Sequence, residues 1–248
     1  MTHRTDPPGW QVLCVPKDGH TDAEYEDAWA VDAARGRFAI ADGASESAFA
    51  GLWARLLTEG FLGARRPRDL AAWLGEVRQR WSKEVMDLEL PWYAEMKREE
   101  GAFATFLGLK LVGGAVDGPI RWRAVAVGDT CLVRLRQDGR VSAFPLRCAV
   151  DFSNHPALIR SRAGIDPPPR RCHGTLRPGE RLLLMTDALA QWFLSIHEQG
   201  GRPWEEVVTL LSAEQPDDAF VEWVSRARER GELHNDDVTL LSIECGFR

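Results

Sequence analysis

The chain has 248 residues, of which 44% are hydrophobic and 27% are charged, and its formal net charge is −6. This composition is that of a globular protein with a large core, and the negative charge gives no support to a nucleic-acid partner. No uncharged run is long enough to span a membrane and residues 1–6 lack the apolar core of a signal peptide, so we expect a cytoplasmic protein.

The first third of the chain predicts three short strands, at residues 10–17, 28–31 and 38–41, joined by a polar loop and a tight turn. Because short connections favour antiparallel neighbours, we expect these strands to lie side by side. Apolar residues at helical spacing then predict a helix from about residue 49, capped by Ser45 or Ser47. A second helix is predicted from Pro67 to about residue 98, with a kink or break at Pro91.

Strands are predicted again at residues 102–112, 120–127, 131–136 and 141–144, with Asp138-Gly139 as a hairpin turn between the last two. Residues 151–171 are rich in proline and predict an irregular excursion. A strand at 181–186, helices at 187–197, 203–212 and 216–230, and a last strand at 238–243 complete the chain. Without repeats or a long linker, we expect one domain over residues 1–248, with an α+β fold of two sheets and helices outside them.

Acidic residues stand at the start or the end of five predicted strands. An unpaired carboxylate at the end of a buried strand is costly to desolvate, and metal coordination offsets that cost. Any one of them could be a turn or cap residue, but five are harder to explain in that way. Ligands that are all oxygen select hard cations such as Mg²⁺ or Mn²⁺, and repulsion among several carboxylates favours two ions. The positions are Glu26-Asp27, Asp42 followed by Gly43, Asp129, Asp187 and Asp236-Asp237.

These motifs follow one another in the order Glu-Asp, Ala-Asp-Gly, Gly-Asp-Thr, Thr-Asp-Ala and Asp-Asp-Val-Thr. In that order they resemble the metal-dependent protein phosphatase family, the type 2C serine/threonine phosphatases, over residues 12–243. The resemblance implies a four-layer α-β-β-α sandwich of two antiparallel sheets flanked by helices. It also implies hydrolysis of phosphoserine or phosphothreonine in a protein by water bound between two Mn²⁺ or Mg²⁺ ions.

The resemblance further implies a role for each acidic position. Asp42 would bridge the two ions and the Gly43 carbonyl would join one of them, while Asp187 and Asp236 would hold the other. Glu26 and Asp27 match the family's acidic pair, which acts largely through metal-bound water. Asp129 and Asp187 match positions linked to a third, weaker ion.

Three departures from the family pattern leave the metal ligands intact. Asp22 stands where many members have an arginine that binds the phosphate, Ala44 stands where many eukaryotic members have a histidine, and Ala188 replaces a glycine. The motif Asp-Gly-Ala-Ser-Glu-Ser at residues 42–47 is typical of a divergent bacterial branch of the family. Membership of that branch implies a role in signalling and a partner kinase. Arg35, Arg37 or an arginine in residues 160–171 is a candidate replacement for the missing arginine.

Two alternatives stay open at this point: a binding or regulatory module that has lost turnover, and a phosphatase of small molecules. Other motifs do not compete, because the chain has no paired-histidine metal motif, no Gly-x-Ser-x-Gly elbow and no phosphate-binding Gly-Lys-Ser/Thr loop. The five cysteines form no Cys-x-x-Cys pair, which argues against a zinc site. The Trp92-Tyr93 pair is either buried or a partner surface, and a single domain of this size favours a monomer.

Overall fold

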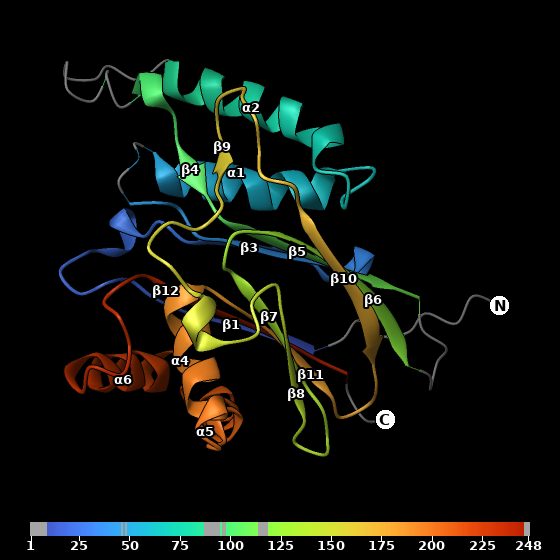
Figure 1. Ribbon diagram of the computed structural model, residues 1–248, viewed down its shortest axis with the longest axis vertical. Coiled ribbons are helices and arrows are strands. Elements are labelled where there is room, and N and C mark those ends of the chain that lie inside the picture. Colours follow the sequence, from blue (N-terminus) through green and yellow to red (C-terminus); the bar gives the residue numbers. More distant parts are fainter. Residues whose placement is uncertain are drawn as a thin grey trace.

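The computed structural model describes residues 9–45, 47, 49–86, 95, 98–113 and 119–245. Two five-stranded antiparallel sheets lie face to face, with helices on their outer faces (Figure 1). The predicted α+β sandwich of four layers is therefore confirmed. The predictions for Pro91 and for Trp92-Tyr93 fall outside the described residues. Among the described helices, none combines the length and the apolar character needed to cross a membrane.

Sheet A has the strand order β1-β12-β11-β7-β8. Its strands are β1 (Gly9–Val15), β7 (Cys131–Leu135), β8 (Val141–Phe144), β11 (Arg181–Met185) and β12 (Val238–Glu244). The hairpin between β7 and β8 turns where Asp138-Gly139 predicts, and Gly139 has a φ of 75°, in the left-handed region.

The expectation that the first three strands are neighbours is wrong for β1, which pairs with β12. The connection that follows β1, residues 16–27, contains the 3-10 helix Asp22–Glu24 and carries the chain into the other sheet. It is longer than a hairpin turn, so β1 is free to pair with a strand that is distant in sequence.

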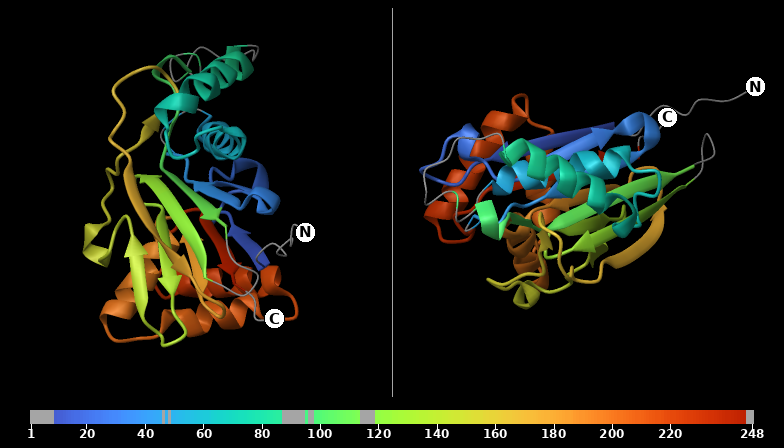
Figure 2. Two further views of the ribbon diagram at one scale, coloured as in Figure 1. Left: turned by 90° about the vertical axis from the view of Figure 1, so that its right-hand side faces the viewer. Right: turned by 90° about the horizontal axis from the view of Figure 1, so that it is seen from above.

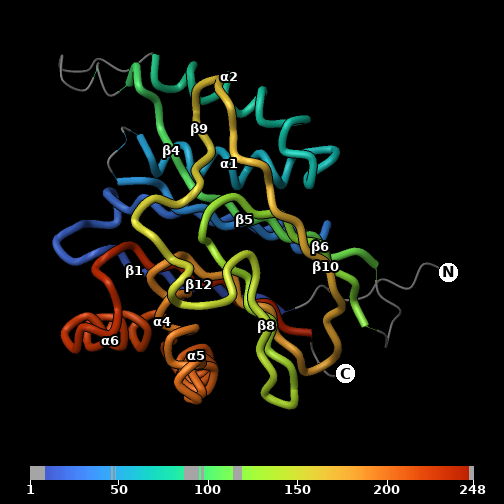
Figure 3. The backbone as a smooth tube through the Cα atoms, viewed as in Figure 1, coloured from blue at the N-terminus to red at the C-terminus, as the bar shows by residue number. Residues whose placement is uncertain are grey.

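Sheet B has the strand order β10-β6-β5-β3-β2. Its strands are β2 (Ala28–Asp32), β3 (Arg37–Ala41), β5 (Phe106–Val112), β6 (Ile120–Val127) and β10 (Arg170–Leu176). A small two-stranded sheet pairs β4 (Phe103–Ala104) with β9 (Ile159–Arg160) beside α1 and α2 (Figure 3). The predicted strand at 102–112 is thus divided between two sheets, and the predicted excursion at 151–171 contains β9 and the start of β10. Because β10 is a largely polar edge strand, it lacks the apolar run that marks a central strand.

Helices cover the outer face of each sheet (Figure 2). The helix α1 (Ala50–Gly63) lies on sheet B and α2 (Ala71–Met86) packs on α1, while α4 (Asp187–Glu198), α5 (Pro203–Leu211) and α6 (Pro216–Glu229) cover sheet A. The second helix begins at Ala71 and not at Pro67. Neither Ser45 nor Ser47 caps α1, because the cap position is Phe49, with a φ of 62° and no side-chain cap.

The alternation of side chains along each strand divides the core into three parts. The apolar side chains between the two sheets belong to one cluster, which includes Phe38, Ile40, Leu107, Leu184 and Leu241. The opposite faces pack against helices, sheet A against α4–α6 and sheet B against α1 and α2. Both sheets are therefore held rigidly from two sides, which fixes the positions of the residues at their strand ends.

Candidate functional site

The predicted acidic residues that flank the strands of sheet B lie at one end of that sheet. Ala28 at the start of β2 pairs with Ala41 at the end of β3. Asp27 precedes the first of these residues and Asp42 follows the second, so the two aspartates lie at the same end of the sheet.

Sheet A places three more aspartates in the same way. Met185 at the end of β11 pairs with Leu240 on β12 and with Cys131 on β7. The positions Asp187, Asp236 and Asp129 extend from these paired ends. Asp187 opens α4, where helix N-terminal dipoles favour a negative charge.

The charges of these five aspartates act on one another. Burial, followed by the charges of the other four aspartates, raises the pKa of Asp42 well above its ordinary value. Burial and the charges of Asp187 and Asp236 raise the pKa of Asp129 to about 7. Burial and the charge of Asp236 raise the pKa of Asp187 to about 6. We call Asp27, Asp42, Asp129, Asp187 and Asp236 the acidic cluster, and the structure brings together the positions that the sequence predicts.

Two carboxylate oxygens of the acidic cluster are buried without a hydrogen-bond partner. They are Oδ1 of Asp27 and Oδ1 of Asp129, in side chains that are nearly inaccessible to solvent. A buried, unpaired carboxylate oxygen is costly unless a cation or a donor meets it. Within the described part of the chain, no three His, Cys, Asp or Glu side chains are close enough to hold one ion. The cluster therefore concentrates negative charge and oxygen donors at one place, while the described residues form no closed coordination shell.

The second oxygen of Asp27 is held by donors from two elements. Oδ2 accepts a hydrogen bond of 2.6 Å from the Thr239 hydroxyl on β12 and one of 3.4 Å from the Tyr25 hydroxyl. The carbonyl oxygen of Val238, 3.2 Å from the Tyr25 hydroxyl, is an alternative acceptor for its single proton. These bonds tie the sheet B end of the site to sheet A and point the unpartnered Oδ1 of Asp27 in one fixed direction.

Asp237 forms different contacts from its neighbour Asp236. Its two oxygens accept hydrogen bonds from the main-chain N–H groups of Lys17, at 2.8 Å, and Glu26, at 2.6 Å. Asp237 is thereby committed to holding the connection between β1 and β2, whereas the Asp236 carboxylate accepts a hydrogen bond of 2.9 Å from the N–H of Asp237.

Gly43 lies where a side chain cannot fit. A Cβ atom there would stand 2.8 Å from the carbonyl carbon of Ala50 and 2.8 Å from the carbonyl oxygen of Glu26. The antiparallel bridge between Gly43 and Ala104 uses the N–H of Ala44 and the carbonyl of Asp42. The carbonyl of Gly43 is outside this bridge, as a metal-ligating carbonyl needs to be.

Lys17 is a residue of the site that the sequence analysis missed. Its Nζ lies 2.9 Å from the hydroxyl oxygen of Ser45, in the loop after Asp42, and 3.6 Å from a carboxylate oxygen of Glu26. The side chain is 16% exposed, so its ammonium group is held at the mouth of the site instead of extending into solvent. No spacing in the sequence marks this lysine, because the loop that brings it back to Ser45 is irregular.

The structure separates two of the candidate arginines from the acidic cluster. Arg37 is buried at the start of β3, the end remote from Asp42, and donates to the carbonyls of Phe61, Leu62 and Ala64 at the C-terminal end of α1. Arg35 is exposed at the same remote end and pairs with Asp32.

The arginines of residues 160–171 differ in how near they lie to the acidic cluster. Arg160 stacks over Phe103 and Arg162 donates to the carbonyl of Arg98. Arg170 pairs in register with Ala126, two residues before the turn that carries Asp129, so it is the member of this segment at the carboxylate end. Asp22 lies on the exposed 3-10 helix, and its carboxylate cannot replace the positive charge of the missing arginine.

A cavity of about 610 Å³ lies beside Glu26 and Asp27. Its lining includes Tyr25, Trp29, Phe49, Leu52 and Arg55. Aromatic and apolar walls with a few charged groups are typical of sites that bind a peptide side chain or a small molecule.

No protein-family model and no curated protein sequence matches this chain. Solved structures match it over almost its whole length. The serine/threonine phosphatase PstP/Ppp of Mycobacterium tuberculosis has a TM-score of 0.61 at 18% identity, over 97% of this chain and 100% of that one. The catalytic domain of PstP in complex with 2 manganese ions has a TM-score of 0.60 at 18% identity, over 97% and 99%. The PPM Ser-Thr phosphatase MsPP from Mycobacterium smegmatis, in complex with cacodylate, has a TM-score of 0.59 at 17% identity, over 97% and 99%. The chain therefore has the fold of the PPM serine/threonine phosphatases, as its motifs predict.

Proposed function

We propose that this chain is a metal-dependent phosphatase that hydrolyses phosphoserine or phosphothreonine in a protein, as one domain over residues 1–248. The observation that supports it is the acidic cluster, in which burial and the charges of neighbouring aspartates raise the pKa of Asp42, Asp129 and Asp187, and two buried oxygens lack partners. A fold shared with PPM phosphatases, one of them solved with 2 manganese ions, supports the same reading.

The residues that would hold the ions are those of the acidic cluster and its neighbours. Asp42, the Gly43 carbonyl, Asp187 and Asp236 would together hold two Mn²⁺ or Mg²⁺ ions. Asp129 would serve a third, weaker site with Asp187. Such ions lower the pKa of bound water towards neutral pH, and they neutralise negative charge on a phosphoryl group.

The chain's own residues would bind and orient the substrate. The Lys17 ammonium, beside Ser45 and Glu26, would donate hydrogen bonds to the phosphate in place of the missing arginine. The carboxylates of Glu26 and Asp27 would orient water at the ions. The hydrogen bond from Thr239 fixes the Asp27 carboxylate, so that its unpartnered oxygen would face that water. The cavity lined by Trp29 and Phe49 would receive residues that flank the phosphorylated one.

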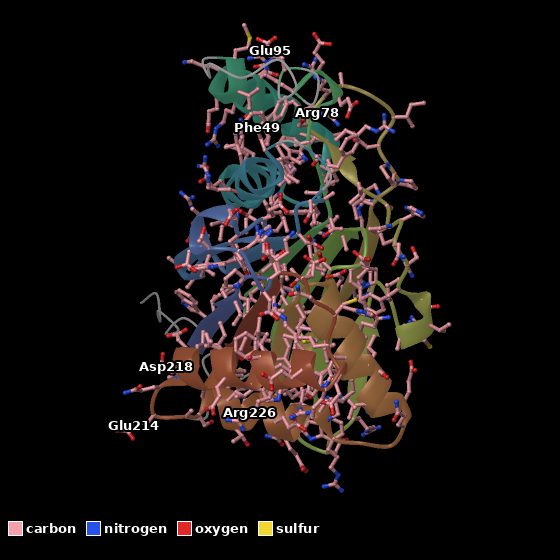
Figure 4. The ribbon with its side chains drawn as sticks, turned by 90° about the vertical axis from the view of Figure 1, so that its left-hand side faces the viewer. Phe49, Arg78, Glu95, Glu214, Asp218 and Arg226 are labelled. Carbon is pink, nitrogen blue, oxygen red and sulfur yellow. The ribbon has the colours of Figure 1, made fainter. Side chains whose placement is uncertain are left out.

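The test is hydrolysis of p-nitrophenyl phosphate by the purified protein, with and without Mn²⁺, beside Asp42→Asn and Asp218→Asn. Asp218 is exposed on α6, far from Phe49 at the cavity (Figure 4). We expect turnover that depends on Mn²⁺, is lost in Asp42→Asn and is kept in Asp218→Asn. Turnover that survives in Asp42→Asn would overturn the proposal.

A second candidate is a regulatory module in signalling that binds a phosphorylated protein, or its kinase, without turnover. Asp22 and Ala44, which replace an arginine and a histidine of many relatives, favour it. Binding of Mn²⁺ and of a phosphopeptide, with no hydrolysis by the wild-type protein, would select this candidate. A preference for sugar or nucleotide phosphates over phosphopeptides would instead select a phosphatase of small molecules.

A further inference from the structure

A second charged surface lies on the outer face of sheet B and extends from the middle of β6 and β10 towards the end opposite to the acidic cluster. Arg121 and Arg123 stand near the start of β6, whereas Asp129 follows the end of that strand. Six residues of extended strand span about 20 Å. These two arginines are therefore remote from the candidate metal site.

Strand register gathers several cations on this face. Arg123 lies directly opposite His173 on β10 and directly opposite Lys110 on β5. Arg121 and Arg171 stand two residues along from members of this row, on the same face of the sheet. We call Arg68, Lys110, Arg121, Arg123, Arg171 and His173 the basic surface.

Arg68 joins the basic surface from the connection between α1 and α2. Its carbonyl accepts a hydrogen bond from the guanidinium of Arg171. Partial burial, followed by the charges of Arg123 and Arg171, lowers the pKa of the Arg68 guanidinium. Its Nε is buried and has no hydrogen-bond partner. The Arg68 guanidinium thus lies close enough to those of Arg123 and Arg171 to be repelled by both, and it holds a donor that the described residues leave unused.

Nothing in the described part of the chain compensates these charges. None of the lysine or arginine side chains of the basic surface forms an ion pair there, although the chain as a whole has a net charge of −6. Like charges directly opposite each other across two strands are destabilising, and Lys110 opposite Arg123 is such a pair. An external anion would relieve this repulsion and satisfy the free donors.

The shape of the surface favours an extended ligand. The edge strand β10 pairs only with β6 among the described strands, so main-chain groups along its other side are available to a new strand. A strand added there would place every second side chain on the face that carries Arg171 and His173.

We propose that the basic surface binds an extended, Asp- and Glu-rich segment of a partner protein, which pairs with β10 and sets its acidic side chains against Arg68, Arg123 and Arg171. This site is distinct from the acidic cluster and does not depend on the proposed phosphatase activity.

Two other classes of anion fit the surface less well. A membrane would need apolar anchors, but the exposed large apolar side chains of the described residues are Trp10, Trp29, Met86, Val150, Ile165 and Val221, none of which is on the outer face of β5, β6 or β10. A nucleic acid would extend beyond the few cations of this face and meet a chain whose net charge is negative.

The experiment is a fluorescence anisotropy titration of the full chain with a labelled peptide as long as β10, in which glutamate alternates with threonine. Three further probes are the same peptide with lysine for glutamate, the same peptide with prolines for threonines, and an oligothymidine. The variants are Arg123→Glu and, as a matched change of charge, Arg147→Glu in the exposed connection after β8. Arg123→Gln is included so that a neutral change can be compared, and thermal unfolding verifies that each variant is folded.

We expect the alternating acidic peptide to bind, more weakly as salt rises, and to lose about tenfold or more in affinity in Arg123→Glu. Arg123→Gln should lose less, and Arg147→Glu should change affinity by less than about twofold. The lysine and proline peptides should not bind. Failure of the acidic peptide to bind the folded wild-type protein would overturn the proposal, and the basic surface would then only protect the edge of β10 from unwanted pairing. Equal binding of the proline peptide would show that the ligand does not pair with β10 as an added strand. Tighter binding of oligothymidine than of the acidic peptide, lost in Arg123→Glu, would show that the ligand is a nucleic acid and not an acidic segment of a protein.

Discussion

The main-chain N–H of Glu26 donates a hydrogen bond of 2.6 Å to Oδ2 of Asp237, a residue 211 positions further along the chain. The other oxygen of Asp237 accepts from the N–H of Lys17. One buried carboxylate therefore positions both the acidic residue and the lysine at the mouth of the candidate site.

Replacing Asp237 with alanine should destabilise the protein and disorder this connection. Two main-chain donors would lose an ionised acceptor, and we expect the free energy of unfolding to fall by about 3 kcal/mol. Urea unfolding measures this loss, with Asp218→Ala on α6 as a control that should change stability by no more than about 1 kcal/mol. Equal unfolding midpoints for Asp237→Ala and the wild type would contradict the role assigned to this carboxylate.

Lys17→Ala should raise the KM for p-nitrophenyl phosphate about tenfold or more and change kcat less, because hydrogen bonds from a charged donor contribute about 1.5–3 kcal/mol. Lys17→Arg should keep most of the affinity, since it keeps the charge and the donors. Steady-state kinetics with saturating Mn²⁺ separate the two constants. Lys83→Ala, on the exposed side of α2, is the matched control and should leave both constants unchanged. An unaltered KM in Lys17→Ala would remove this lysine from the phosphate site.

Arg37 and Arg35 provide a pair of matched variants at one sheet end. Arg37→Ala should lower the free energy of unfolding by about 3 kcal/mol, because the buried carbonyls at the end of α1 lose a charged donor. Arg35→Ala should change it by less than about 0.5 kcal/mol, because its ion pair with Asp32 is exposed. Chemical denaturation measures both effects. Neither change should alter the KM, and an increase for Arg37→Ala in a fully folded sample would restore Arg37 as a phosphate ligand.

The stability of the metal-free protein should fall as the pH rises. The folded-state pKa values of Asp129 and Asp187, about 7 and about 6, exceed the value of about 3.9 for an unfolded aspartate. The folded state therefore binds more protons than the unfolded state in this range. The corresponding stability is fully present below about pH 4 and is lost as the pH rises through about 6 to 7.

Urea unfolding of chelator-treated protein at several values between pH 5 and pH 8 tests this dependence. Asp129→Asn should reduce the slope, since the amide does not ionise, and added Mn²⁺ should stabilise the protein most at the upper end of the range. A stability of the metal-free wild type that increases towards pH 8 would show that the carboxylates are not buried together.

The acidic cluster could be predicted because each aspartate is marked locally. Asp42 directly follows an apolar strand and Asp187 follows another, so the sequence alone places carboxylates at strand ends. That these ends meet depends on strand order, for which the resemblance to a known fold was needed. The pairing of β1 with β12 could not be inferred from residue spacing, since nothing near residue 10 specifies a partner near residue 243.

The features that the sequence analysis missed depend on contacts between distant segments. Lys17 reaches Ser45 through an irregular loop, and Arg37 meets the end of α1 only after the helix has packed on sheet B. Phe49 occupies the cap position of α1 although Ser45 and Ser47 have the better capping side chains, because the Ser47 hydroxyl is bonded to the carbonyl of Ala44 and the N–H of Phe103. In these cases tertiary contacts outweigh local propensity.

The place of β12 between β1 and β11 has a consequence for biosynthesis. Residues 238–244 are translated after every other strand of both sheets, yet they fill an interior position of sheet A, beside Asp236 and the Thr239 hydroxyl that orients Asp27. Until they emerge from the ribosome, β1 lacks the one described strand with which it pairs, and Asp27 lacks the hydrogen bond from Thr239. The candidate metal site is thus completed only after residues 238–244 have been synthesised, and a nascent chain that stalls before them has no complete centre with which to bind ions or phosphate.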